Sequence, residues 1–159
     1  MLVTTPRYPP QKLLLSRFLT PDRILFFFRN ESDRTITELL AGSLIGLDAN
    51  RVLNAIRVAE PSGPTVLGTS LQVYRGQRAG LDETRATMAI SRFGCEYPVN
   101  RYLPVHLLIL FLAPAGDRFQ ERAFLRSLNR LFLTEDLTTQ LSRRTSPAEA
   151  LSMIRNAES

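Results

Sequence analysis

Apolar residues are distributed along the chain in two patterns, compact runs of strand length and longer stretches with helical spacing. The strongest compact run covers residues 104–114, which are apolar apart from one histidine. A continuous run, rather than an alternating one, is typical of a central strand that is covered on both faces. Residues 23–29 form a second apolar run, and weaker strand patterns occur at 67–74 and 86–93. The two apolar runs are too short to span a bilayer.

The helical pattern places apolar residues at i, i+3 and i+4, so each predicted helix has one apolar face. Asp117 stands before one such stretch and is expected to cap its first backbone N–H groups. Ser146, Pro147 and Glu149 together predict a capping box at the start of the last helix. We expect helices in residues 13–19, 36–44, 48–56, 118–132, 135–143 and 147–154.

The order of these elements predicts the fold class. One strand is followed by two helices, then by three strands and finally by helices, which indicates an α/β fold with a mixed sheet and helices on both faces. Residues 1–12 are rich in proline and poor in apolar residues, and they lack the long apolar segment of a signal peptide. We therefore expect a flexible N-terminal arm at 1–12 and a single domain at 13–157.

The composition is that of a soluble globular domain, with 159 residues of which 44% are hydrophobic. The net charge is +5, and almost all of the positive charge comes from arginine. The arginines are scattered along the sequence and accompanied by acidic residues, so no stripe specific for nucleic acid is evident. One cysteine and one histidine cannot form an internal disulfide or a common Cys/His zinc site. We expect neither a metal nor a cofactor.

Residues 59–76 are the stretch in which we expect a functional site. Prolines and glycines are concentrated in its first half, which excludes a helix there, and its second half has the composition of a strand. The stretch ends with a charged residue next to a glycine, Arg75-Gly76. Two interpretations are open: a loop that presents a reactive group at the edge of the sheet, or a plain connection between a helix and a strand.

Taken in order, several short motifs have the spacing of one known family. These motifs are Leu19-Thr-Pro-Asp-Arg-Ile24, Ala59-Glu60, Gly63 to Gly68, Tyr74-Arg75-Gly76, Pro104-Val105 with Ala113-Pro114, Phe124-Leu125 with Leu128, and Ser146 to Leu151. As a set they resemble the enzyme IIA domain of the bacterial phosphoenolpyruvate-dependent phosphotransferase system, of the fructose, mannitol and nitrogen-regulatory type. The resemblance extends over nearly the whole chain, and it implies a three-layer α/β sandwich.

The resemblance also assigns residues to the family's phosphoryl-transfer site. The position of the phosphoacceptor histidine is occupied by Arg75, and that of the preceding proline by Tyr74. The supporting arginine is replaced by Ala59, and the second histidine by Phe124. The remaining positions of this vestigial pocket are Glu60, Gly63, Thr65, Gly68 and Gly76. The alignment therefore implies that the chain has no catalytic residue of the family.

Two residues decide what chemistry is possible. A guanidinium stays protonated and has no lone pair to accept a phosphoryl group, so Arg75 could bind an anion weakly but not carry phosphate. Alternatively, Arg75 pairs with Glu60 or Asp82, or faces water. His106 is the one histidine of the chain, and its apolar surroundings favour a hydrogen-bonded core residue over a nucleophile.

Three functions follow from these observations. The first is a regulatory or protein-binding module that cannot be phosphorylated, with a phosphotransferase component or a transporter as partner. The second is an active phosphocarrier whose histidine is misaligned, and the third is an arginine-based binder of anions or nucleic acid. We expect a cytoplasmic protein or a cytosolic domain of a membrane transporter.

Overall fold

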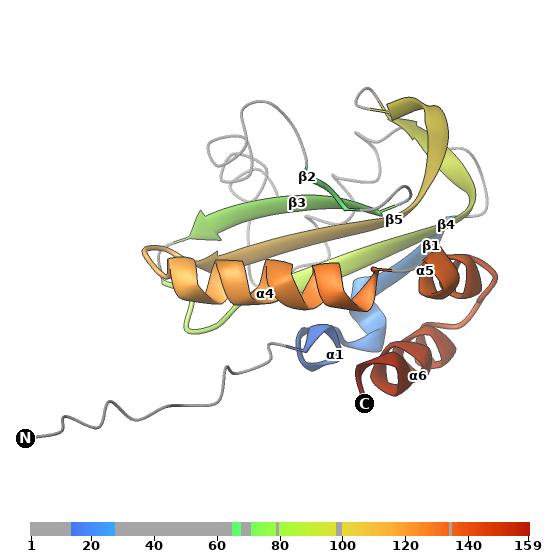
Figure 1. Cartoon of the computed structure of the whole chain (residues 1–159). Coiled ribbons are helices and arrows are strands. Elements are labelled where there is room, and N and C mark those ends of the chain that lie inside the picture. The colour runs from blue at the N-terminus through green and yellow to red at the C-terminus, as the bar shows by residue number, and fades with distance from the viewer. Residues whose placement is uncertain (1–13, 28–64, 68–70, 79, 98–99, 134) are drawn as a thin grey trace, which may run out of the picture.

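The computed structural model contains a mixed sheet with helices packed on it (Figure 1). Its described residues are 14–27, 65–67, 71–78, 80–97, 100–133 and 135–159. The helices are α1 (Leu15–Phe18), the 3-10 turn η1 (Pro21–Arg23), α4 (Arg118–Leu131), α5 (Glu135–Ser142) and α6 (Pro147–Glu158). The strands are β1 (Ile24–Phe27), β2 (Thr65–Leu67), β3 (Leu71–Arg78), β4 (Arg85–Tyr97) and β5 (Asn100–Pro114).

The sheet has five strands in the order β1-β4-β5-β3-β2. Strand β5 is central, and it pairs antiparallel with β4 and parallel with β3. Strand β1 adds parallel to β4, and β2 adds antiparallel to β3. The predictions of a mixed sheet and of a central strand at 104–114 are therefore confirmed.

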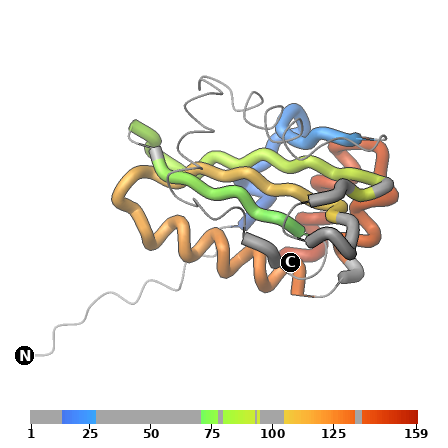
Figure 2. The backbone as a smooth tube through the Cα atoms, turned by 90° about the horizontal axis from the view of Figure 1, so that it is seen from above, coloured from blue at the N-terminus to red at the C-terminus, as the bar shows by residue number. Residues whose placement is uncertain are grey.

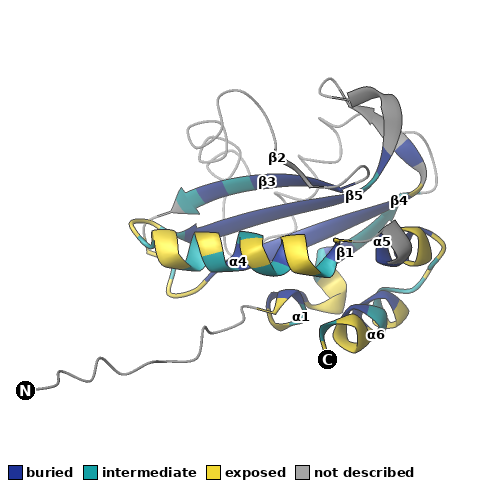
Figure 3. Ribbon diagram, in the orientation of Figure 1, coloured by how far each residue is buried: buried dark blue, intermediate teal, exposed yellow. Residues whose placement is uncertain are grey.

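Both faces of β5 are buried, as its continuous apolar run predicts. On one face, Leu107, Ile109 and Phe111 belong to the main core together with residues of α1, α4, α5 and α6. On the other face, Leu108 and Leu110 are also fully buried. Figure 3 shows the buried central strands beside the exposed outer side of α4. The helices expected at 36–44 and 48–56 lie outside the described residues.

Helix α4 is the element that connects the core to the site. It lies below the strands in Figure 1, and Figure 2 shows it running roughly along them. Its Phe124 packs between two rings, with centroid distances of 4.5 Å to Phe111 and 5.7 Å to Phe18. Asp117 caps the helix, because its Oδ1 accepts a hydrogen bond from the backbone N of Gln120 at 3.0 Å. This confirms the predicted cap.

Three local predictions are wrong. Strand β3 continues to Arg78, beyond the strand pattern at 67–74, because pairing with β5 continues to Pro114. Strands β4 and β5 extend toward each other beyond the strand patterns at 86–93 and 104–114, and β4 has a register shift beside Gly94, whose φ of 80° suits glycine. Ser146 is the N-cap of α6, but its side chain makes no capping hydrogen bond, so no capping box forms.

None of the helices among the described residues is both long and apolar enough to cross a membrane.

Candidate functional site

Arg75 lies within β3 and is paired in register with Phe111 of β5. Alternate residues of a strand face opposite sides of the sheet, so Val73, Arg75 and Gln77 share one face. Val73 belongs to the core beneath α4, which identifies that face as the one covered by this helix. The guanidinium of Arg75 therefore projects toward α4 rather than out of a loop.

The residue of α4 that contacts Arg75 is Glu121. Its Oε1 lies 3.4 Å from Nη1 of Arg75, and the side chains are 16% and 33% exposed. The other carboxylate oxygen, Oε2, accepts a hydrogen bond of 2.8 Å from Nε2 of Gln77. Gln77 in turn accepts at Oε1 from the backbone N of Gly116, at 3.4 Å. These contacts form a polar network that ties β3 to the first half of α4.

The network restricts what Arg75 can bind. A carboxylate already sits next to the guanidinium, so an incoming phosphate or carboxylate has to compete with Glu121. Because the pair is partly exposed, its net contribution to stability is about 0.2–1 kcal/mol. The weak anion site at Arg75 stays a prediction, and Glu121 is the group that sets its strength.

Phe124 and Tyr74 both lie away from the Arg75 guanidinium. Phe124 is fully buried among core rings, about one helical turn after Glu121. Tyr74 points to the opposite face of the sheet from Arg75, where it is 8% exposed and donates a hydrogen bond of 3.4 Å to Oε1 of Gln72. Tyr74 therefore fills space in the interior and does not stack on Arg75.

Sequence reasoning missed Glu121 and Gln77. A usable signal was present, since Phe124 belongs to the apolar stripe of its helix and such a residue is expected to be buried. The residue that faces a polar partner should stand at the border of that stripe, as Glu121 does.

The other predicted pocket positions are only partly described. Gly76 is buried within β3, and Thr65 begins β2. Ala59, Glu60, Gly63 and Gly68 lie outside the described residues. The vestigial pocket as a whole therefore stays a prediction.

His106 occupies a different part of the sheet. Its Nδ1 donates a hydrogen bond of 2.9 Å to the backbone O of Ser91. It precedes Phe111, the register partner of Arg75, by about 16 Å of strand at about 3.3 Å per residue. Because it alternates with Leu107, which faces the core under α4, His106 also projects from the opposite face.

Two cavities lie between helices and not at Arg75. The larger, of about 800 Å³, is lined by residues of α5 and α6, among them Leu137, Arg144 and Met153. The smaller, of about 110 Å³, lies between Leu14, Arg130 and Glu158. Within the described part of the chain, no three His, Cys, Asp or Glu side chains come together in a group that could hold a metal ion.

Comparison with solved structures identifies the architecture. The chain is similar to the nitrogen regulatory protein IIA-Ntr from Neisseria meningitidis, with a TM-score of 0.76 and 20% identity, over 87% of this chain and 97% of that one. It is also similar to IIA mannitol from Escherichia coli, with a TM-score of 0.69 and 20% identity, over 86% of this chain and 98% of that one. The chain has the enzyme IIA fold. This confirms the fold expected from the sequence motifs.

A third structure with the enzyme IIA fold was determined with a protein partner. It is the mannitol enzyme IIA of Escherichia coli in complex with phosphorylated mannitol enzyme IIB, with a TM-score of 0.68 and 20% identity, over 87% of this chain and 97% of that one. No family model matches the sequence, and no curated protein matches it.

Proposed function

We propose that this chain is an enzyme IIA-like domain that no longer carries phosphate and acts instead by binding a protein partner. The observation that carries the proposal is the Arg75–Glu121 ion pair. The motif alignment assigns Arg75 to the position of the phosphoacceptor histidine, and a protonated guanidinium cannot attack phosphorus. The adjacent carboxylate further disfavours the approach of a phosphoryl group.

The position of His106 supports the same proposal. A phosphocarrier of this type needs a neutral imidazole whose lone pair is open to the phosphoryl donor. His106 is the one histidine in the sequence, and donation from its Nδ1 to Ser91 leaves the lone pair on Nε2, so its location rather than its chemistry separates it from this role. Its location on the opposite face from Arg75 argues against a misaligned phosphohistidine at the same site.

A phosphotransferase component or a transporter is the partner that we propose, with the domain acting in the cytoplasm. The support is the mannitol enzyme IIA of the same fold, whose structure includes enzyme IIB. In this proposal the domain binds a component of the phosphotransferase system or a transporter and does not pass on a phosphoryl group.

The decisive experiment is a phosphorylation assay by intact mass. The protein is incubated with phosphoenolpyruvate and the general phosphotransfer proteins, with the mannitol enzyme IIA of Escherichia coli as positive control. We expect a phosphoryl mass increment for the control and none for this chain. An increment on this chain that disappears in His106→Ala would overturn the proposal and establish an active carrier with an unusual site.

A further inference from the structure

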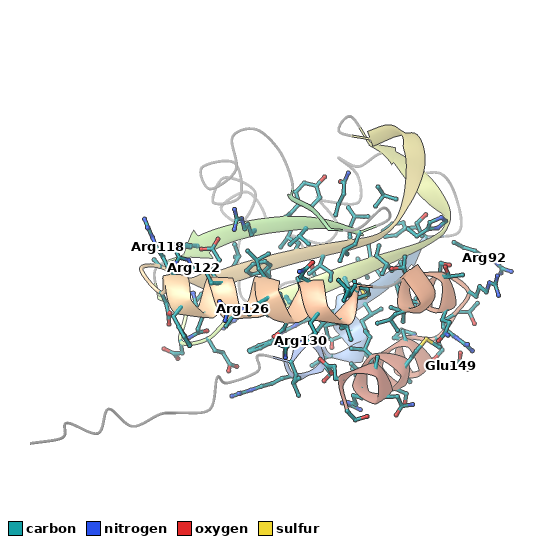
Figure 4. All side chains as sticks on the ribbon, in the orientation of Figure 1. Arg92, Arg118, Arg122, Arg126, Arg130 and Glu149 are labelled. Carbon is teal, nitrogen blue, oxygen red and sulfur yellow. The ribbon has the colours of Figure 1, made fainter. Side chains whose placement is uncertain are left out.

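Helix α4 presents a row of arginines on its outer side. Arg118, Arg122, Arg126 and Arg130 are all exposed and follow one another at a spacing of four residues. Figure 4 shows them in order along the helix. At about 1.5 Å of rise per residue, neighbours in this arginine row are about 6 Å apart and the row is about 18 Å long.

The row is not neutralised by its own helix. Glu121 is the acidic residue within α4, and it faces Arg75 on the inner side. Asp117 is used as the N-cap, and Glu158, which lines a small cavity with Arg130, accepts a hydrogen bond from the backbone N of Ser16. Among the described residues, none of the row's arginines has an ion pair or a hydrogen bond from its side chain.

Apolar side chains stand at both ends of the row. Phe119 is 68% exposed near its start, and Leu133 is 76% exposed just after the end of the helix. They are two of the three large apolar side chains that are exposed in the described part of the chain. The surface is therefore a basic line with an apolar residue at each end.

Such a row is unfavourable for an isolated domain. Like charges at i and i+4 destabilise a helix by about 0.2–0.5 kcal/mol per pair. Burying Phe119 and Leu133 against a partner would remove apolar area from water. A partner of opposite charge would therefore reduce the repulsion between the arginines and cover the exposed apolar area.

We propose that the arginine row and its two apolar ends dock an acidic amphipathic helix of a partner protein. A helix with carboxylates at i, i+4 and i+8 repeats the same spacing of about 6 Å. Each carboxylate can take a guanidinium in bidentate geometry. Apolar residues one turn outside the carboxylates would then meet Phe119 and Leu133.

A protein helix fits this surface better than nucleic acid or a membrane does. A phosphodiester backbone would match the charges but offers no apolar surface to the two ends. An anionic bilayer would require several apolar side chains along the row, where Phe119 is the one exposed apolar residue of α4. The pairing of a central charged line with apolar ends favours a partner helix.

The test uses the full chain and a designed helical peptide. The peptide has glutamates at an i, i+4 spacing with a leucine beyond each end, and a second peptide has lysine in place of glutamate. The row variant Arg122→Ala/Arg126→Ala/Arg130→Ala is compared with Arg92→Ala/Arg143→Ala/Arg155→Ala, which removes the same charge from exposed arginines elsewhere. Affinity is measured by fluorescence anisotropy at several salt concentrations.

We expect the glutamate peptide to bind the wild type and the control variant, and the row variant to bind about tenfold more weakly, as three exposed ion pairs imply. Arg122→Glu/Arg126→Glu should reverse the preference toward the lysine peptide. Phe119→Ser should weaken binding without changing its dependence on salt. Circular dichroism verifies that the variants are folded.

Three results would overturn the inference. Equal losses in the row and control variants would mean that only net charge matters. Row-dependent binding to a DNA duplex or to phosphatidylserine vesicles that exceeds binding to the peptide would assign the surface to that ligand. Absence of any binding to the glutamate peptide would leave the row as a solvated face. The inference is independent of the phosphorylation assay, since none of the row's arginines belongs to the network of Arg75, Glu121 and Gln77.

Discussion

Strands β3 and β5 lie side by side and parallel, yet Arg75 of β3 and His106 of β5 have opposite surroundings. Arg75 is located toward the end of β3, faces α4 and pairs with Glu121. His106 is located before the β3–β5 pairing begins, projects from the opposite face and donates to a backbone oxygen of Ser91. The imidazole has the lone pair that phosphoryl transfer needs, whereas the guanidinium has the position that the motif alignment assigns to the acceptor. The lone pair and the acceptor position therefore belong to two different residues.

The apolar segment of β5 that follows His106 and includes Phe111, the register partner of Arg75, should be the part of the molecule where substitutions lower stability most. Phe111→Ala removes a fully buried ring that packs on Phe124, and we expect a loss of about 3–5 kcal/mol in the free energy of unfolding. Leu108→Ala on the other face should cost about 2–5 kcal/mol. Urea denaturation measures both. A loss below about 0.5 kcal/mol for Leu108→Ala would show that its face is not part of a packed layer.

A histidine transplant tests which residue of α4 faces the Arg75 position. In Arg75→His/Glu121→His the two imidazoles should lie close enough that protonation of one lowers the pKa of the other, by about one unit. In Arg75→His/Phe124→His the second ring replaces a core residue, so we expect no such coupling and a less stable fold. NMR titration of the ring protons distinguishes them. If the two imidazoles titrate as a coupled pair in Arg75→His/Phe124→His and not in Arg75→His/Glu121→His, then position 124 and not position 121 faces position 75.

The hydrogen bond of His106 should have a moderate structural effect and no effect on the Arg75 end. His106→Ala removes the donor to the Ser91 carbonyl, and we expect about 1 kcal/mol of destabilisation. The exposed residue Arg92 provides a control, since Arg92→Ala should change stability by less than about 0.5 kcal/mol. Equal effects of the two substitutions in thermal unfolding would contradict a specific role for this bond.

The smallest expected effect concerns anion binding. Glu121→Gln leaves the shape of the network but removes its negative charge, so phosphate and sulfate should bind up to about fivefold more tightly. Arg75→Ala should abolish that binding. Backbone amide shifts during titration follow it. An affinity unchanged by Glu121→Gln would mean that the anions bind elsewhere.

The sequence predicts the scaffold better than the site. The run at 104–114 and the Asp117 cap depend on local pattern, so strand β5 and the start of α4 could be anticipated. The Arg75–Glu121 pair depends on how α4 is placed along β3, which no local pattern specifies.

The arginine row was missed for a related reason. In the sequence the four arginines are separated by other residues, and two acidic residues, Asp117 and Glu121, are close to them, so no basic cluster is evident. A helical period of 3.6 residues turns the same positions into one exposed line, while the two acids are directed to the cap and the inner face.

The long hairpin of β4 and β5 has a consequence for how the chain folds. These two strands are separated by two residues in the sequence and pair up to Tyr97 and Asn100, whereas Leu71 pairs with Leu107 and Ile24 with Met88 across much longer stretches of chain. Closing a short loop loses less chain entropy, so the hairpin should form early, with β3 and β1 adding to its two sides afterwards. The segment that contains Arg75 would then be ordered late. Substitutions there should change the rate of unfolding more than the rate of folding.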